Sequence, residues 1–261
     1  MKITALMENT ASAPELICEH GLSLYIEACG KKILFDMGQS GAFAVNAKRL
    51  GVDLSAVDVA ILSHGHYDHG GGVLRFFEEN AYAPLYVSDL AFARHYNGTE
   101  KYIGLDPAIE NSGRLVRTGK EDVLLAPGLT IRKLDPAARK YPSFGQGLCV
   151  KHGEEFELDD FLHEQYLEII EGEKHVLVSG CSHRGILNIV HAFSPDVLVG
   201  GLHFMKLDPE GEELSGMGKA LKRTHTVYYT GHCTGLAQYA RLREMLGGQL
   251  HYLAAGDSVY L

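Results

Sequence analysis

Four short apolar runs in this chain each lead into a turn that carries histidine, and this recurrence constrains the fold more than any other feature. Runs of this length, rich in valine, leucine and isoleucine, are typical of strands buried in a sheet. We expect the histidines that follow them to return to the same face of the fold. The runs are VDVAILS, KHVLVSG, PDVLVGG and TVYYTG, and the histidines are His64, His183, His203 and His232.

Helical and strand-like segments alternate around these runs. Strands are expected at Lys2–Met7 and in GLSLYIEA and KKILFD, with a hairpin turn at Cys29-Gly30-Lys31. Helices are expected from Ser40 to Leu50, in SDLAFARHY with Ser88 as its cap, and in VLRFFEEN, GILNIVHAF, ELSGMGKALKRT and CTGLAQYARLREMLGG. Each half of the chain therefore combines strands with crossing helices. The pattern predicts an α/β (α+β) fold, a four-layer αββα sandwich of two mixed sheets with helices outside.

Two stretches lack a sustained period. Residues 97–120 mix glycine with polar and charged residues, so we expect a loop excursion there that covers a site. A second irregular stretch is expected from Asp135 to Gly147, and strands are expected in DVLLAP, LTIRKL, YLEIIE and LHYLAAGDSVYL. No composition break marks a linker, and 261 residues with 46% hydrophobic content suit a single domain over residues 1–261.

The net charge and the lengths of the apolar runs limit which kinds of molecule the protein is expected to bind. The formal net charge of −9 disfavours nucleic acid, whose phosphates need a basic footprint. No apolar run reaches the roughly 18 residues that span a bilayer, and the start MKITALMENTASAPE lacks the order of a signal peptide. We therefore expect a cytoplasmic protein with a small-molecule substrate and no nucleic-acid or membrane partner. Five widely spaced cysteines without CxxC pairing are expected to be reduced thiols.

The densest group of chemically active residues is the sequence HGHYDH, residues 64–69, which directly follows the run VDVAILS. It supplies His64, His66, Asp68 and His69 within six residues. Imidazole nitrogens and carboxylate oxygens are the ligands that zinc, iron and manganese accept. Gly65 and the glycines that follow permit the tight turn that would aim the ligands to one side. The alternative, a polar surface loop with unrelated histidines, is disfavoured by this concentration of ligands.

These residues resemble the HxHxDH signature of the metallo-β-lactamase-like superfamily. The combination of HGHYDHGGG, GCSH, GGLH and GHCTG is similar to one branch, the dihydropterin-methyl-ribofuranosylaminobenzene-phosphate synthase-like proteins, and the resemblance spans about residues 3–261. It implies that His64 and His66 hold one metal and that Asp68 and His69 hold a second. It also implies that later histidines, chiefly His183 and His232, complete the sites, with His203 as a further possible ligand. The implied cofactor is a divalent transition metal, one or two per chain, with zinc first and manganese or iron as alternatives.

The resemblance assigns two further residues near the metals. In ILFDMG, Asp36 matches the aspartate that orients a metal ligand by hydrogen bonding, and its alternative is a cap for the following helix. The family's bridging aspartate in a GD motif corresponds here to Gly180-Cys181. Cys181 is therefore either a thiolate ligand or a small packed residue. We expect His183, rather than Cys181, to supply the missing ligand, because a neutral imidazole binds metal without the deprotonation that a thiol requires.

These residues favour a metal-dependent hydrolase, or a metal-assisted transferase, that uses a metal-activated water on a small, phosphorylated or pterin-like substrate. Asp68 is the expected catalytic residue, since it can hold its metal while orienting the water or taking its proton. The alternative is a non-catalytic, metal-stabilised protein that binds or senses a small ligand. A Ser-His-Asp hydrolase is disfavoured because no GxSxG elbow is present.

Cations and aromatic residues in or beside the irregular stretches are the candidate substrate contacts, since they would suit a phosphorylated ring. Ordinary solvated loop charge is the alternative for each of them. The main candidates are Arg94, Tyr96 and Lys101, and the weaker ones are His95, Arg114, Lys140 and Tyr141.

Overall fold

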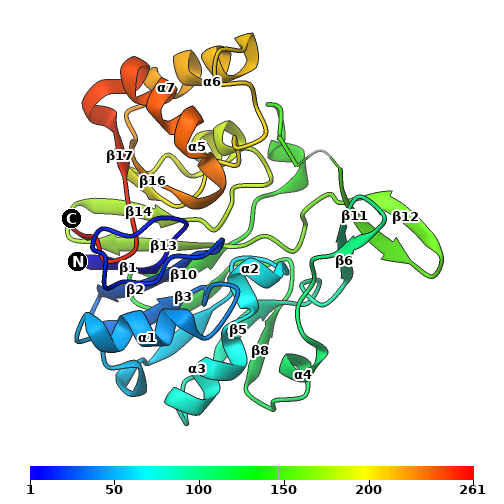
Figure 1. Cartoon of the computed structure of the whole chain (residues 1–261), viewed down its shortest axis with the longest axis vertical. Helices are drawn as coiled ribbons and strands as arrows, with labels where there is room; N and C mark the ends of the chain where they lie inside the picture. Colours follow the sequence, from blue (N-terminus) through cyan, green and yellow to red (C-terminus); the bar gives the residue numbers. More distant parts are fainter. Residues whose placement is uncertain (146) are drawn as a thin grey trace.

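Two seven-stranded sheets face each other at the centre of the computed structural model, which describes residues 1–145 and 147–261 (Figure 1). Gln146, within the stretch expected to be irregular, lies outside the described residues. The first sheet has the order β18-β1-β2-β3-β4-β5-β8 and is antiparallel from β18 to β3 and parallel from β3 to β8. Its strands are β1 (Lys2–Met7), β2 (Ser23–Ala28), β3 (Lys31–Phe35), β4 (Val59–Ile61), β5 (Leu85–Ser88), β8 (Leu115–Thr118) and β18 (Ser258–Tyr260).

The second sheet mirrors this mixture, with the order β17-β16-β15-β14-β13-β10-β9. It is parallel from β17 to β14 and antiparallel from β14 to β9. Its strands are β9 (Val123–Ala126), β10 (Leu129–Arg132), β13 (Tyr166–Glu171), β14 (Lys174–Val178), β15 (Val197–Val199), β16 (Val227–Thr230) and β17 (Leu250–Tyr252). The final segment LHYLAAGDSVYL therefore gives one strand to each sheet.

Alternation along the strands explains how both faces of each sheet are buried. Ile33 and Phe35 of β3 pack into a core shared by the two sheets, whereas Leu34 between them packs against the helices of the first sheet. In β14, Val178 faces the shared core and Leu177 faces the helices of the second sheet. Side chains of successive strand residues point to opposite faces, so apolar residues at every position match a sheet covered on both sides.

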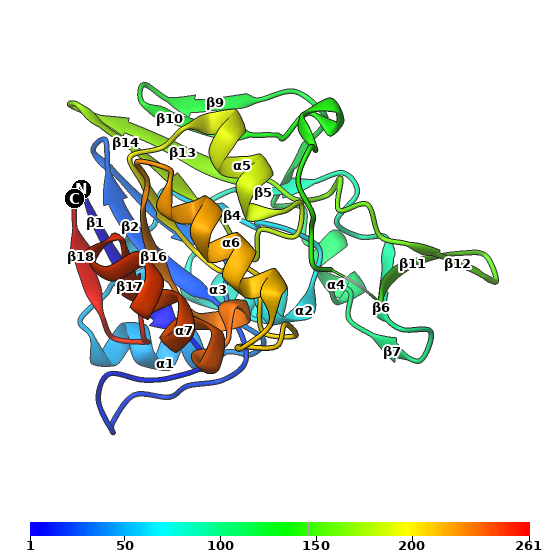
Figure 2. The same cartoon turned by 90° about the horizontal axis from the view of Figure 1, so that it is seen from above.

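Helices form the two outer layers (Figure 1), and one of these layers lies in front of the strands in the view of Figure 2. The first sheet is covered by α1 (Ala42–Arg49) and α3 (Val73–Glu79), and the second by α5 (Ile186–Phe193), α6 (Glu212–Lys222) and α7 (Leu236–Leu246). The predicted αββα sandwich is thus confirmed. Two short helices are α2 (Tyr67–Gly70) and α4 (Pro107–Glu110), and 3-10 turns lie at Leu54–Ala56, Pro136–Ala138, His232–Thr234 and Gly247–Gln249. Among the described residues, no helix combines the length and apolar character that crossing a membrane requires.

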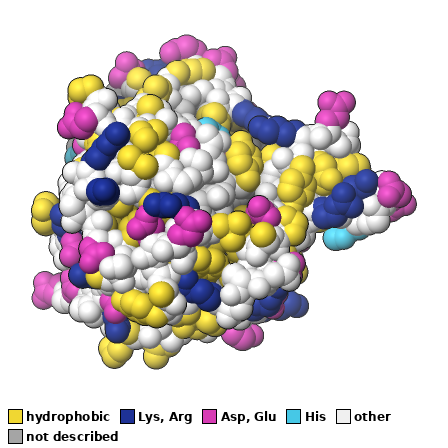
Figure 3. Space-filling view, turned by 60° about the horizontal axis from the view of Figure 1, so that its bottom comes forward, with side chains coloured by type: hydrophobic (Ala, Val, Ile, Leu, Met, Phe, Trp, Pro, Cys, Tyr) yellow, Lys and Arg dark blue, Asp and Glu magenta, His cyan; other side chains and the backbone are white. Residues whose placement is uncertain are grey.

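A third, four-stranded sheet projects from one side of the sandwich, and we call it the arm. It has the order β12-β11-β6-β7, with β6 (Arg94–Asn97), β7 (Lys101–Tyr102), β11 (Leu148–His152) and β12 (Glu155–Leu158). In the space-filling view the projection carries hydrophobic and basic side chains together (Figure 3). Two of its apolar side chains, Tyr102 and Leu158, are exposed.

The arm corrects two expectations from the sequence. The helix expected in SDLAFARHY is wrong, because residues 94–97 pair with β11 as strand β6, and this long-range pairing outweighs local helical spacing. The loop excursion expected at 97–120 is also wrong in extent, because this range contains β7, α4 and β8. Strand β8 pairs in parallel with β5 and belongs to the first sheet. The HGHYDH segment, expected as a tight turn, contains the short helix α2.

Candidate metal centre

The histidines expected at strand ends do meet between the two sheets. His64 and His66 follow β4, Asp68 and His69 lie in α2, and His183, His203 and His232 follow β14, β15 and β16 respectively. Three imidazoles, those of His64, His66 and His183, bring ring nitrogens within 4.8 Å of one another, and we call them the first ligand group. All three side chains are buried.

Four ring nitrogens of the first ligand group have no hydrogen-bond partner among the described residues. The Ser63 hydroxyl donates to Asp36 Oδ2 at 2.7 Å, so it accepts from His64 Nδ1, also at 2.7 Å. His64 Nε2 is then a lone pair, and it has no partner among the described residues. His66 Nε2 and both ring nitrogens of His183 also have no hydrogen-bond partner among the described residues. Buried polar atoms are normally satisfied, so this convergence fits a cation held by the three rings.

A second ligand group consists of Asp68, His69 and His232. Asp68 Oδ2 lies 3.8 Å from His69 Nε2 and 3.3 Å from His232 Nε2, and the two ring nitrogens are 3.2 Å apart. Outer partners turn both Nε2 atoms inward: His69 Nδ1 is 2.6 Å from Asp36 Oδ2, and His232 Nδ1 is 2.9 Å from Asn9 Oδ1. The point where these atoms meet therefore favours positive charge. A carboxylate and two imidazoles suit a divalent transition metal.

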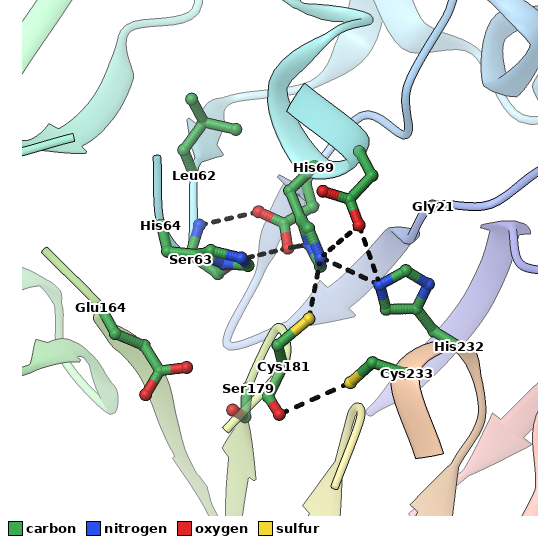
Figure 4. Close-up of polar contacts among 12 residues, drawn as sticks. Gly21, Leu62, Ser63, His64, His69, Glu164, Ser179, Cys181, His232 and Cys233 are labelled. Carbon is green, nitrogen blue, oxygen red and sulfur yellow. Dashed lines mark hydrogen bonds and ion pairs between the residues drawn. The ribbon is translucent and has the colours of Figure 1, made fainter. Parts of the chain in front are cut away.

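The sulfur of Cys181 points toward His69 (Figure 4). Its Sγ is 3.1 Å from His69 Nε2, and it shares a 4.8 Å cluster with His64 and His69. The structure therefore brings both Cys181 and His183 to the centre, so the two are not alternatives in space. Cys233, a neighbour that the sequence did not single out, is also buried there, with its Sγ 3.5 Å from the Cys181 carbonyl oxygen.

One carboxylate orients a ligand in each group. Asp36, fully buried with a left-handed φ of 58°, accepts from the Ser63 backbone N–H at 2.7 Å and from the Ser63 hydroxyl. The same carboxylate holds His69. Asp36 therefore acts on His69 directly and on His64 through Ser63. Backbone strain of this kind persists where surrounding contacts fix it.

Three consecutive residues that the sequence analysis missed anchor the loops of the first ligand group. His163 Nδ1 accepts from the Gly65 N–H at 2.9 Å. Glu164 accepts from the backbone N–H groups of His183 at 2.7 Å and Arg184 at 3.1 Å. Gln165 donates to the Leu62 carbonyl oxygen at 2.7 Å. The segment 163–165 therefore connects the turn after β4 with the turn after β14.

The turn that carries His232 has its own anchor at the end of β1, which was also missed. The buried carboxylate of Glu8 accepts from the His232 N–H and from Tyr252 Oη, the latter at 2.9 Å. Its other oxygen accepts from Thr10 through the backbone N–H at 2.6 Å and the hydroxyl at 2.7 Å. This anchor holds His232 in a left-handed conformation, with φ of 49°.

The two ligand groups differ in their electrostatics. Burial lowers the pKa of His64, His66 and His183 well below the usual value, so these rings are neutral near pH 7 and present lone pairs. Burial also opposes charge on Asp68, yet His69, His20 and His232 outweigh it and hold the pKa of this carboxyl well below its usual range. Asp36 and Asp68 likewise overcome burial and raise the pKa of His69. The second group therefore concentrates charge, whereas the first is neutral.

A cavity of about 120 Å³ opens above both groups. Lys101 and Asn97 from the arm line one side of it, and Lys206 and Met205 line another. His20, also missed in the sequence, lines the cavity with its Nε2 3.3 Å from Asp68 Oδ2. Other residues that line the cavity are His66, Tyr67, Asp68, Ile103, Leu148, Cys181, His183, His203, His232 and Cys233.

The remaining expected substrate contacts do not line this cavity. Arg94 and Tyr96 lie on β6, where the guanidinium donates to Tyr96 Oη at 3.2 Å. Arg114 donates to carbonyl oxygens of Asn80 and Ala83 at the end of α3, which is a structural role. The Lys140 and Tyr141 backbones donate to Asn188, and the His95 ring is buried against Asp159 at 2.8 Å.

Comparison with known proteins agrees with this architecture. The chain is 28% identical to the 7,8-dihydropterin-6-methyl-4-(beta-D-ribofuranosyl)-aminobenzene-5'-phosphate synthase of Methanocaldococcus jannaschii, covering 92% of this chain and 90% of that protein. The crystal structure of Tm1679, described as a metal-dependent hydrolase of the beta-lactamase superfamily, superposes with a TM-score of 0.85 at 26% identity, covering 100% and 99% of the two chains. Zn²⁺-bound PqqB from Methylobacterium extorquens shares the fold, with a TM-score of 0.62 at 12% identity over the full length of both chains. The model of the metallo-beta-lactamase superfamily matches residues 16–201, and the chain therefore belongs to that superfamily.

Proposed function

We propose that this protein is a metal-dependent enzyme with two metal sites that hydrolyses, or transfers a group to or from, a small phosphorylated substrate. One observation carries the proposal: two sets of inward-facing donor atoms lie side by side at the floor of a cavity whose rim holds two lysines. We assign His64, His66 and His183 to one metal and Asp68, His69 and His232 to the other, with the Cys181 sulfur between them.

The chemistry of the donor set fits divalent metals, with zinc as the first choice because it accepts imidazole, carboxylate and thiolate. Such metals supply Lewis acidity that polarises a phosphoryl or carbonyl oxygen and acidifies water. The protein's own contribution is orientation. Asp36 fixes one imidazole of each group, and Asn9 directs His232 Nε2 toward Asp68.

Asp68 is the proposed catalytic residue. Its low pKa keeps the carboxylate ionised near pH 7, so it can accept a proton from water or hold that water by a hydrogen bond. His20 supports this role, because Asn9 Nδ2 donates to His20 Nδ1 at 3.3 Å and so leaves Nε2–H to donate to Asp68. The orientation of Asp68 is therefore fixed from the cavity side as well.

Lys101 and Lys206 are the proposed contacts for an anionic group of the substrate. Lys101 lies over the Tyr67 ring, 5.4 Å from its centroid, and donates to Tyr67 Oη at 3.5 Å. This packing limits the freedom of the ammonium group before substrate binds. The same cavity is lined by Lys101 of the arm and by Lys206, so we place the anionic group of the substrate there, beside the two ligand groups. A pterin-like substrate is proposed from the synthase relative alone.

The test is to load chelator-treated protein with zinc, manganese or iron and to assay each form. The probes are a generic carboxylic ester, a generic phosphodiester, and a dihydropterin-6-methyl donor together with ribofuranosylaminobenzene 5'-phosphate. Metal-dependent turnover of the first two supports hydrolysis, and product formation only from the third pair supports transfer. Protein that binds metal but turns over none of the probes would favour the ligand-binding or sensor alternative. Failure to bind any metal would refute the proposal.

A further inference from the structure

Two buried thiols, those of Cys181 and Cys233, form a pair whose second member has no part in the proposed chemistry. Both cysteines are free, and each is only 2% exposed. Their sulfur atoms, together with a ring nitrogen of His232, lie within 4.8 Å of one another. The Cys233 sulfur points toward Cys181 (Figure 4), and it lies 3.5 Å from the Cys181 carbonyl oxygen. The two thiols are therefore neighbours in space, although they are 52 positions apart in the chain.

The topology of the second sheet brings the two thiols together. Cys181 lies in the turn after β14 and Cys233 in the turn after β16, and both strands pair in parallel with β15 between them. The carboxyl ends of parallel strands meet at one edge of a sheet. Gly201, which follows β15, donates to the Gly180 carbonyl oxygen at 2.8 Å, and a Cβ atom on Gly201 would overlap the Cys233 sulfur. Glycine at this position therefore leaves room for the Cys233 sulfur beside Cys181.

An oxidant can reach the pair from the cavity above the ligand groups. Cys181 and Cys233 both line this cavity, whose volume is about 120 Å³. The other three cysteines are exposed or partly exposed, and none of them is among the described residues that line the cavity. A small neutral oxidant such as hydrogen peroxide can enter the cavity, where each thiol has a second thiol beside it. A thiol of this kind, next to a partner that can resolve its oxidised form, is typical of redox-sensitive cysteines.

We propose that Cys181 and Cys233 are a redox-active pair that hydrogen peroxide converts to a disulfide. In the first step one thiol is oxidised to a sulfenic acid and the peroxide is reduced, which releases one water. In the second step the other thiol attacks the sulfenic sulfur, the S–S bond forms, and the sulfenic oxygen leaves as a second water. A disulfide needs its sulfurs about 2.05 Å apart, so both side chains turn toward each other about their Cα–Cβ bonds.

Closure of the disulfide changes the candidate metal centre. In the reduced protein the Cys181 sulfur lies 3.1 Å from His69 Nε2, where its thiolate can bind metal. A disulfide sulfur carries no negative charge, and its bond to Cys233 draws it toward the turn after β16. The pair therefore acts as a switch that weakens metal binding when the protein is oxidised. This second part of the inference rests on the proposed function, because it requires Cys181 to lie beside bound metal.

The first test counts thiols and does not depend on metal. Reduced, chelator-treated protein is exposed to a small molar excess of hydrogen peroxide, alkylated in denaturant, digested and analysed by mass spectrometry without reduction. We expect the peptides that contain Cys181 and Cys233 to be linked, with dithiothreitol breaking the link. The variant in which Cys18, Cys29 and Cys149 are all serine should form the same link. Five free thiols after treatment, a link among other cysteines only, or sulfinic acid without a link would overturn the proposal.

The second test is zinc affinity, measured by competition with a chromophoric chelator on reduced and oxidised wild-type protein. We expect the disulfide form to bind zinc about tenfold more weakly, and dithiothreitol to restore the affinity. The matched control is Cys233→Ser, which cannot form the link, so any dithiothreitol-reversible change in its zinc affinity should stay below about twofold. Equal zinc affinity in both forms of the wild-type protein would overturn the switch. Reduced protein that binds no zinc would instead refute the proposed function, and the thiol count would still decide whether the disulfide forms.

Discussion

The contiguous residues of the candidate metal centre and the dispersed ones are anchored in different ways. The residues from His64 to His69 are contiguous, and their main orienting partner, Asp36, reaches them through Ser63 and across one sheet. His183 and His232 come from separate strands, and their turns are held by Glu164 and Glu8. The last of these contacts joins residues 224 positions apart in the chain. Local sequence therefore specifies one part of the site, and long-range folding specifies the other.

The largest effect on turnover is expected for a substitution in the contiguous HGHYDH segment. Asp68→Asn keeps the shape of the side chain but removes the negative charge and the capacity to take a proton. Turnover should fall by about 100-fold or more, while the free energy of unfolding of the metal-free protein changes far less. Turnover and urea unfolding are measured on the same preparation. Undiminished turnover would remove Asp68 from the mechanism.

Substitutions of His183 and Cys181 test whether the turn after β14 supplies metal ligands. His183→Ala removes one of three imidazoles, so zinc affinity of the first ligand group should fall by more than the roughly 10- to 100-fold typical of a lost outer hydrogen bond. Cys181→Ser keeps the size and replaces the thiol, and we expect a smaller loss. Metal content after dialysis decides the order. Greater metal loss from Cys181→Ser would make the thiolate the principal ligand.

Glu8 and Glu164 offer a matched pair of substitutions. Both oxygens of each carboxylate accept hydrogen bonds, so the amide of a glutamine must point an N–H at another donor. We expect Glu164→Gln to weaken zinc binding at the first ligand group, and Glu8→Gln to weaken it at the second, each by about tenfold. Stepwise zinc titration separates the two sites, with Glu157→Gln on exposed β12 as the control. Equal weakening of both sites by either variant would show that the two anchors act as one unit.

The pH dependence of the metal-free protein should also separate the groups. His64, His66 and His183 have lowered pKa values, so their contribution to stability is present above about pH 6.5 and is lost as the pH falls. His69 has a raised pKa and acts with the opposite sign, losing its contribution as the pH rises. As the pH falls below about 6.5, each of the three rings lowers the free energy of unfolding by up to about 1.4 kcal/mol per pH unit. Acid should therefore destabilise the protein overall. Urea unfolding at pH 7.5, 6.5 and 5.5 measures this, and a flat profile would contradict it.

The smallest effect is expected at the rim of the cavity. Lys206→Ala and Lys101→Ala should raise KM for a phosphorylated substrate by about three- to tenfold, with little change in kcat, since both act on binding through partly screened charge. Lys120→Ala, at an exposed position, is the control. An equal fall in kcat would place the lysines in the chemical step instead.

The sequence predicts the layers because the strands and helices have clear apolar periods. It also predicts the HGHYDH motif and the histidines at strand ends, because each follows an apolar run and lies beside glycine. It missed the arm, because the pairing of β6 with β11 joins distant segments and overrides the local helical spacing of SDLAFARHY. It also assigned His95 to the substrate, whereas the ring is buried against Asp159. Glu8, Glu164 and Lys206 carry no motif, so only the folded chain reveals what they contact.

The division of each ligand group between distant parts of the chain has a consequence for biosynthesis. A ribosome-bound chain exposes the HGHYDH segment long before His183 and His232 have been made. At that stage neither group holds its full set of donors, and any metal bound by the segment alone can exchange freely. On the metal assignment proposed above, stable capture has to wait until the turn with His232 has left the ribosome and docked on Glu8.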